Sequence, residues 1–216
     1  MDIRFENGAV MQVVGPSGCG KTLFVSKILN NADVIFKDKI GTIYWLTGSG
    51  GETSLTEQSL SRLHNLKLVH GFPKNWINLP KGGDVMVIDD LFEEANSEKN
   101  FNNLFTKIAR HRQVFVIFIT QNLFHQGGKH RTRNINVHYL VLFKNPRDQT
   151  VIDHVARQAF PNNKKFLIDA YHDATVGKPF GYILIDFTQQ CVDDVRVRSN
   201  IFDEQNGITV YKQHTP

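Results

Sequence analysis

The chain has 216 residues, 41% hydrophobic and 21% charged, which is typical of a soluble globular protein. Its cysteine usage suits a reducing compartment and its first residues lack a signal-peptide pattern, so we expect it to be intracellular. We expect one domain over 1–202 and a loose tail over 203–216. Lysine and arginine exceed aspartate and glutamate by 25 − 21 = 4, too few to indicate nucleic-acid binding. Two cysteines and scattered histidines argue against a disulfide framework and a zinc site. The longest clean apolar run, Val114 to Ile119, is too short to cross a membrane.

Residues 9–29 predict a buried strand, a glycine-rich turn and a helix that begins at Lys21. The turn matches G-x-x-x-x-G-K-[ST] in full, and glycines are needed where backbone N–H groups curl around phosphate oxygens. The helix points its positive N-terminus at the same phosphates. Lys21 can reach the β- and γ-phosphates, and the Thr22 hydroxyl can bind Mg²⁺. The predicted nucleotide site consists of Gly15, Pro16, Ser17, Gly18, Cys19, Gly20, Lys21 and Thr22.

The elements that follow alternate between strand and helix. Strands are predicted at 41–46 and 66–70, with an amphipathic helix at 53–65 between them. The loop at 47–52 contains three glycines and follows a strand, where loops often lie beside a ligand in open α/β sheets. A plain linker would have the same composition, so both interpretations of this loop remain. Residues 71–83 are predicted to be a connecting loop.

Two carboxylates end the next predicted strand. Four apolar residues from Val85 to Ile88 indicate a strand that is buried on both faces, and Asp89 and Asp90 follow at its carboxyl end. In a P-loop protein, an acidic residue at this place holds the Mg²⁺ shell, normally through water. We therefore assign Asp89 to the Mg²⁺ site, while Asp90 is placed to polarise an attacking water. The pattern would be weak evidence by itself and gains its meaning from the complete P-loop before it.

A polar strand end is also predicted further along the chain. A helix at 96–109 leads into an apolar strand at 114–119, which ends in Thr120, Gln121 and Asn122. A polar residue at the tip of a strand beside the acidic strand can sense the γ-phosphate or position water. Gln121 is the best candidate, and the residues on either side of it are reserves. A capping or turn residue is the alternative interpretation.

The segment from Phe124 to Arg133 is basic and contains glycine. Its cations, Lys129, Arg131 and Arg133, fit a loop directed at a polyanion such as DNA, although a solvated surface loop would have the same composition. We take these three side chains as the candidate polyanion contact, which becomes a DNA contact if the family resemblance given below holds.

The remainder of the chain predicts two strands and two helices. The strands are expected at 139–143 and 181–186, and the helices at 149–160 and 164–174. From Gln189 onward the chain is polar and is expected to end as a loose tail. The alternation of strands and helices predicts an α/β fold with a mainly parallel central sheet and helices on both faces.

Five segments in this order carry a resemblance to a known family: the P-loop, the IDD strand end, HRQVFVIFITQNLF, HYLVLFKNPRD and PFGYILIDF. Over roughly 9–202 the chain is similar to the genome-packaging ATPases of Polinton/Maverick-type elements and related DNA viruses, in the FtsK–HerA class of P-loop motors. The resemblance implies a RecA-like P-loop NTPase domain that hydrolyses Mg-ATP. It further implies a homo-oligomeric ring, expected to be a hexamer, that pumps double-stranded DNA into a viral capsid, with the capsid or its portal vertex as a partner. We expect no membrane partner, and the host nucleus or cytoplasm and the virion are the expected locations.

The resemblance also implies functions for single residues. Gln121 matches the family's glutamine after the fourth strand, and Arg112, just before that strand, matches a place from which such motors supply an arginine finger to the neighbouring subunit. Arg147, in NPRD, is a second candidate for the finger. Motors of this class usually carry glutamate where this chain has Asp90, whose shorter side chain leaves its function as the water-activating base open. The implied catalytic residues are Lys21, Asp89, Asp90, Gln121, Arg112 and Arg147.

Three other functions remain compatible with the motifs. A helicase-like or segregation motor that acts on free DNA would have the same core. A P-loop nucleotide or nucleoside kinase shares the fold and size, but the TQN strand end and the lack of an obvious arginine-rich lid argue against it. A nucleotide-binding structural subunit without turnover is the third alternative, and the complete P-loop makes it less attractive.

Overall fold

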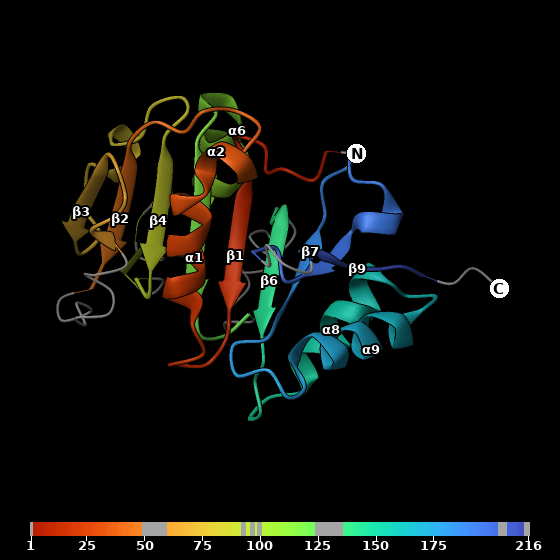
Figure 1. Ribbon diagram of the computed structural model, residues 1–216. Coiled ribbons are helices and arrows are strands. Elements are labelled where there is room, and N and C mark those ends of the chain that lie inside the picture. Colours follow the sequence, from red (N-terminus) through yellow and green to blue (C-terminus); the bar gives the residue numbers. More distant parts are fainter. Residues whose placement is uncertain are drawn as a thin grey trace.

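The computed structural model describes residues 2–48, 60–91, 94–95, 98, 101–123, 136–202 and 207–213. These residues form one nine-stranded sheet with helices packed on it (Figure 1). Its strands are β1 (Val10–Val14), β2 (Ile43–Thr47), β3 (Leu66–His70), β4 (Val85–Asp89), β5 (Phe115–Thr120), β6 (Tyr139–Phe143), β7 (Tyr182–Asp186), β8 (Val197–Ser199) and β9 (Thr209–Tyr211).

The sheet is mainly parallel, as predicted. Its strand order is β3-β2-β4-β5-β1-β6-β7-β8-β9. Neighbours from β3 to β6 in this order pair in parallel, whereas β7, β8 and β9 pair antiparallel. Every residue of β1, β5 and β6 is buried, which explains why these segments are apolar at nearly every position instead of alternating.

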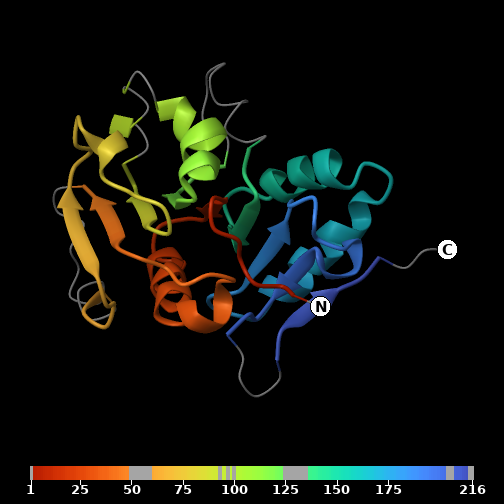
Figure 2. The same ribbon diagram turned by 90° about the horizontal axis from the view of Figure 1, so that it is seen from above.

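Helices cover both faces of the sheet (Figure 2). One face packs against α1 (Lys21–Asn30) and the short α2 (Ala32–Ile35), and the other against the remaining helices. Those are α5 (Phe101–Asn103), the π-helical η2 (Leu104–Ile108), α6 (Ala109–Arg112), α8 (Thr150–Ala159) and α9 (Lys164–Thr175), with the 3₁₀ turn η1 (Trp76–Asn78). A second 3₁₀ turn, η3 (Asp193–Val195), precedes β8. None of the helices in the described part of the chain has the length and apolar character needed to cross a bilayer.

The predicted strands agree with the observed ones to within a residue or two, but two predicted helices need correction. The helix expected at 96–109 extends to Arg112 and contains a π-helical segment in its described part. The helix expected at 53–65 is wrong in its second half, because residues 61–65 form turns. Its first half lies outside the described residues. Asn65 there has a φ of 60°, a left-handed conformation that an α-helix does not accommodate.

The C-terminal part is more ordered than the sequence predicts. The polar stretch after Gln189 contributes β8, and β9 lies within the 203–216 segment that was expected to be loose. The two strands pair antiparallel, with Val197 opposite Tyr211 and Ser199 opposite Thr209. Both are short and carry polar residues, so no apolar run indicates them. The described part of the predicted tail therefore extends the sheet.

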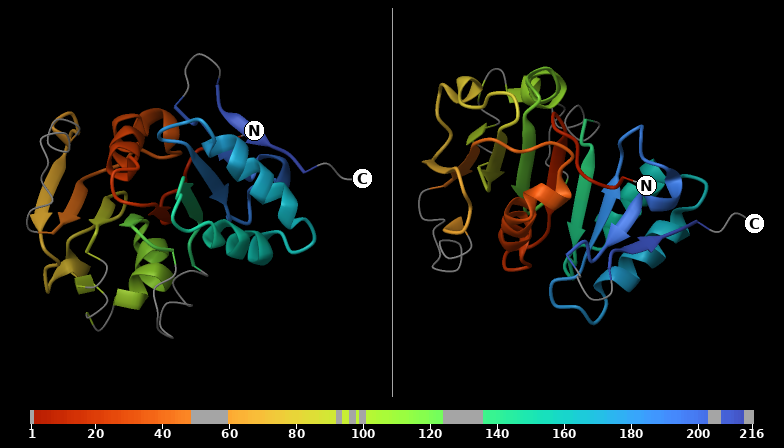
Figure 3. Two further views of the ribbon diagram at one scale, coloured as in Figure 1. Left: turned by 90° about the horizontal axis from the view of Figure 1, so that it is seen from below. Right: turned by 45° about the horizontal axis from the view of Figure 1, so that its top comes forward.

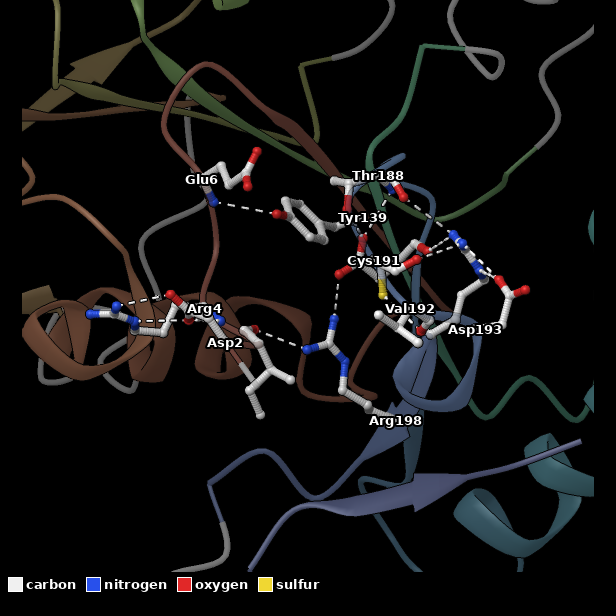
Figure 4. A network of polar contacts seen from close by, with 12 residues as sticks. Asp2, Arg4, Glu6, Tyr139, Thr188, Cys191, Val192, Asp193 and Arg198 are labelled. Atoms are coloured by element: carbon white, nitrogen blue, oxygen red, sulfur yellow. Dashed lines mark hydrogen bonds and ion pairs between the residues drawn. The ribbon is translucent and has the colours of Figure 1, made fainter.

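A buried ion pair holds this C-terminal hairpin to the rest of the domain (Figure 4). Arg198 is 2% exposed, and its guanidinium donates to the Asp186 carboxylate at 2.6 Å and to the Ile3 carbonyl at 2.9 Å. The other oxygen of Asp186 accepts from the backbone N–H and hydroxyl of Thr188. One side chain thus joins β8, the end of β7 and the N-terminal segment.

Removal of this guanidinium should destabilise the fold strongly. Arg198→Ala leaves the Asp186 carboxylate buried without its partner, so we expect a loss of about 3–5 kcal/mol in the free energy of unfolding. The matched control is Arg157→Ala, which breaks the half-exposed pair with Asp153 on α8 and should cost no more than about 0.5 kcal/mol. Urea unfolding of both variants measures the difference. Equal losses would contradict a stabilising function of the buried pair.

Candidate nucleotide site at the carboxyl edge of the sheet

The parallel strands bring the predicted site residues to one edge of the sheet. β1, β4 and β6 point downward in Figure 1, β5 runs parallel to β1 and β4, and the left panel of Figure 3 views the lower side of the molecule. The P-loop follows β1, the Asp89–Asp90 pair ends β4, Gln121 follows β5, and residues 144–149 follow β6. Ligands of open α/β sheets bind at this edge.

The P-loop has its conformation because of its glycines. A Cβ on Gly15 would lie 2.7 Å from both the Cys19 sulfur and the Phe143 Cβ, so this position has no space for a side chain. Gly18 has open space around it but a φ of +77°, and Gly20 has a φ of +98°, both in the left-handed region. Glycine adopts that region without the steric penalty of other residues. Ser17 and Gly18 at the tip of the loop are exposed.

The N-terminus of α1 is open for an anion. Its capping residue is Gly20, which supplies no side-chain cap, and its first turn contains no acidic residue. Its uncapped N–H groups and positive dipole end thus remain available. The ammonium group of Lys21 is buried in the loop and donates to the carbonyls of Gly15 at 2.8 Å and Pro16 at 3.0 Å. This geometry fits the phosphate cradle that the sequence predicts.

The strand pleat brings Asp89 to Thr22. Side chains alternate along β4, so Val85 and Val87 point toward α1, and Asp89 shares their face. The Thr22 hydroxyl donates to the Asp89 carboxylate at 3.5 Å, although 66 residues separate the two in sequence. A hydroxyl and a carboxylate oxygen are the hard ligands that Mg²⁺ prefers, with the rest of its shell supplied by water and phosphate. The residues present therefore fit a magnesium ion.

Asp89 is strained electrostatically. Burial and the neighbouring charge of Asp90 raise its pKa to about 6, while a hydrogen bond from the Trp45 side chain, the charge of Lys21 and the Thr22 hydroxyl act in the opposite direction. Trp45 is fully buried in β2, two residues before the position that pairs with Asp89. The sequence did not single it out. Strand alternation places it on the α1 face, but only the strand order shows that β2 adjoins β4.

The residues after β4 and β5 differ in their surroundings. Asp90 is exposed, with a φ of 52° that turns the chain out of the strand. Gln121 is exposed and lines a cavity of about 70 Å³ together with Gly15 and residues of the β6–α8 loop. Asn122 lines the same cavity, whereas Thr120 is buried and accepts from the Gln12 amide at 3.3 Å. Thr120 therefore connects β5 to β1 and is the poorer candidate for a phosphate sensor.

The two candidate arginine fingers lie at opposite edges of the sheet. Arg112 ends α6, before β5 begins, and donates to the Ile77 carbonyl. β5 separates it from the P-loop by about 17 Å at about 3.3 Å per residue. Arg147 is exposed in the β6–α8 loop at the P-loop edge. The proposed DNA-binding residues Lys129, Arg131 and Arg133 lie outside the described residues.

Tyr171 is a further residue of this edge that sequence reasoning missed. Its hydroxyl donates to the Phe143 carbonyl at 3.0 Å and accepts from the Asn145 N–H at 3.1 Å. The contact connects α9 to the loop after β6, and both Tyr171 and Asn145 line the cavity beside Gln121. A tyrosine on the buried face of a helix gives no sequence signal of such a contact.

The raised pKa of Asp89 predicts a pH-dependent cost in stability. In the unfolded chain the carboxyl group loses its proton near about pH 4. In the folded chain it retains the proton to about pH 6, so stability falls as the pH rises through this window. Asp89→Asn removes the charge and should raise the free energy of unfolding by about 3 kcal/mol at neutral pH.

Denaturant unfolding across this pH range tests the prediction. The advantage of Asp89→Asn should vanish below about pH 4, where the carboxyl group is neutral in both states. Asp90→Asn is the matched control, and its effect should be smaller because Asp90 is exposed. Parallel stability profiles for Asp89→Asn and the unmodified chain would contradict the unfavourable charge.

Comparison with known proteins identifies the fold. No family model and no curated protein match the sequence. Among solved structures, the genome packaging NTPase B204 from Sulfolobus turreted icosahedral virus 2, in complex with sulfate, matches with a TM-score of 0.57 at 13% identity, over 100% of this chain and 99% of that chain.

Two more structures extend the comparison. B204, the DNA-packaging ATPase from Sulfolobus turreted icosahedral virus, matches with a TM-score of 0.56 at 10% identity over 98% of this chain and 100% of that chain. The B204 protein of the second virus in complex with ATP-gammaS matches with a TM-score of 0.53 at 13% identity, over 96% and 98% of the two chains. The agreement over nearly the whole length shows that this chain has an α/β, RecA-like P-loop NTPase fold similar to that of viral packaging NTPases.

Proposed function

We propose that this chain is a Mg-dependent ATPase that assembles into a ring, a hexamer by our expectation, and translocates double-stranded DNA into a viral capsid. The observation that carries the proposal is the meeting of Lys21, Thr22, Asp89 and Gln121 at one edge of a fold shared over nearly its full length with packaging NTPases. The likeness at 13% identity supports the fold alone. The assignment of ATP hydrolysis therefore depends on these side chains.

Binding of the triphosphate would use the backbone of the P-loop. The N–H groups from Gly15 to Thr22 and the uncapped start of α1 supply donors and positive potential. The Lys21 ammonium, which donates to two P-loop carbonyls, would turn to the β- and γ-phosphates. The exchange of neutral carbonyl acceptors for charged phosphate oxygens strengthens its hydrogen bonds.

Hydrolysis would rest on positioning and charge. Thr22 and Asp89 would hold a magnesium ion, which supplies neutralisation of the charge that develops on the phosphates. Asp90 and Gln121, from the ends of β4 and β5, would orient a water for in-line attack on the γ-phosphate. Because the nucleophile is water, Gln121 would act by orienting it, and only the Asp90 carboxylate could also accept its proton.

The positions of Arg112 and Arg147 at opposite edges of the sheet suggest different functions for them. Arg112 lies at the edge opposite to its own P-loop, which suits a finger that enters the site of the neighbouring subunit. Arg147 lies at the edge of its own P-loop, which suits a contact within the subunit. A finger supplied in trans typically accelerates hydrolysis by about 10³ to 10⁵. Hydrolysis would therefore be slow until subunits assemble.

ATP turnover should depend on both DNA and protein concentration. We expect steady-state hydrolysis to rise with long double-stranded DNA, and to rise faster than linearly with protein, because each site needs a neighbour. Lys21→Ala should reduce the rate to background. Alanine at Lys129, Arg131 and Arg133 together should reduce the stimulation by DNA and leave the DNA-free rate unchanged, since these cations would contact DNA phosphates.

Three outcomes would contradict this proposal in different ways. Turnover that is indifferent to DNA but triggered by a nucleoside monophosphate would indicate a kinase. A stronger response to single-stranded than to double-stranded DNA would favour a helicase. Nucleotide binding without turnover under any of these conditions would indicate a structural subunit.

Mixing of two inactive variants should identify the finger. Arg112→Ala and Lys21→Ala should each be inactive, but an equimolar mixture should recover about one quarter of the activity, because a site between unlike subunits in a closed ring can combine the intact lysine of one with the intact arginine of the other. The matched mixture of Arg147→Ala with Lys21→Ala should recover nothing if Arg147 acts in its own subunit. Recovery in the second mixture alone would make Arg147 the finger instead.

A further inference from the structure

The loop between α9 and β7 lies beside the P-loop. β7 runs antiparallel to β6, with Tyr182 opposite Phe143, so it begins at the edge where β1 and β6 end. Residues 176–181, which connect α9 to β7, are therefore at the bottom of Figure 1 with the P-loop. The Lys144 N–H donates to the Gly181 carbonyl at 3.1 Å and ties the loop to the end of β6.

The ring of Phe180 in this loop lies beside the phosphate-binding turn and is exposed to solvent. The residue is 59% exposed, although most phenylalanines of the described chain are buried. A Cβ on Gly20 would lie 3.0 Å from one ring carbon and 3.6 and 3.7 Å from two more, so the ring touches the P-loop where α1 begins. In the part of the chain that the structure describes, no other aromatic ring pairs with it.

The backbone holds Phe180 in this position. Gly177 has a φ of +70°, and a Cβ on Gly181 would lie 2.6 Å from the Ala174 carbonyl oxygen and 2.7 Å from the Thr175 Cα. The Gly181 N–H donates to the Lys178 carbonyl at 3.2 Å. The turn that carries Phe180 is therefore packed tightly onto the end of α9, which fixes the backbone position of this residue.

The nucleoside end of a nucleotide bound to the P-loop would lie near the ring of Phe180. Thr22 and Asp89 mark the γ-phosphate end, on the side of β1 that faces β5 and β4. The nucleoside is at the other end of the triphosphate and so leaves the P-loop on the opposite side, over β6 and β7. Phe180 is the exposed aromatic side chain of the described chain at that place, and the first turn of α1 adds the exposed Leu23.

We propose that the ring of Phe180 is the stacking platform for the base of the bound purine nucleotide. The inference rests on the nucleotide site proposed above and extends it to the residue that takes the base. Base and aromatic ring attract through their π-faces, and the contact also removes an exposed apolar ring from water. It would explain why an apolar side chain is retained in solvent beside a phosphate site.

Calorimetric titration with two ligands tests the platform. Mg-ATP has a base, whereas Mg-tripolyphosphate offers the same phosphate chain without one. Phe180→Ala and Phe180→Leu should each weaken ATP binding about tenfold, the loss expected for one stacked base, and Phe180→Tyr should bind as the unmodified chain does. Tripolyphosphate should bind all four proteins equally. Because Phe180 is exposed, the variants should unfold at the same denaturant concentration as the unmodified chain.

Several results would overturn the platform. An unchanged affinity for ATP in Phe180→Ala, or in Phe180→Leu, would contradict stacking of the base on Phe180. An equal loss for ATP and tripolyphosphate would mean that Phe180 supports the P-loop and not the base. If the unmodified chain binds neither ligand, or if Lys21→Ala binds both ligands as the unmodified chain does, the proposed nucleotide site itself is wrong. This result can be distinguished from the two results above, which concern Phe180 alone.

Discussion

The P-loop depends on the close approach of backbone at Gly15. A Cβ at this position would lie 2.7 Å from atoms of both Cys19 and Phe143. The Gly15 N–H donates to the Thr120 carbonyl, and the Gly15 carbonyl accepts from Lys21. Three strands, β1, β5 and β6, therefore converge on one residue without a side chain. The backbone of the phosphate loop is part of the sheet edge, so strand pairing sets its geometry, whereas the Lys21 side chain would have to turn from the loop carbonyls to a bound anion.

Whereas the fold accommodates the backbone at Gly15, it disfavours the negative charge of the Asp89 carboxylate. Burial and Asp90 disfavour its charged form, and the hydrogen bonds and charge from Trp45, Thr22 and Lys21 offset this only in part, since its pKa remains at about 6. A divalent cation beside Thr22 and Asp89 would remove the penalty, because its charge favours the ionised form. An unfavourable carboxylate charge would thus favour the binding of a cation, a common trade between stability and function.

The sequence predicted the strands and the P-loop because those signals are local. Apolar runs, the glycine pattern and polar strand ends placed Thr22, Asp89 and Gln121 at one edge, and the structure shows Asp89 against Thr22 and Gln121 beside the P-loop. It could not supply Trp45 or Phe180, since their positions depend on which strands are neighbours and on the antiparallel entry of β7. The hairpin of β8 and β9 was missed because a buried ion pair and antiparallel pairing, not an apolar run, hold it.

The two edges of the sheet carry different parts of the proposed chemistry, and this has a consequence for assembly. Lys21, Asp89 and Gln121 belong to the carboxyl edge, whereas Arg112 belongs to the amino edge. A strand about 17 Å long is a rigid spacer that no side-chain rotation can bridge. If Arg112 acts, it must act on another copy, and head-to-tail contacts of this kind form rings when the rotation between copies closes. A parallel sheet with groups at both edges is therefore suited to coupling hydrolysis to the contact between neighbours.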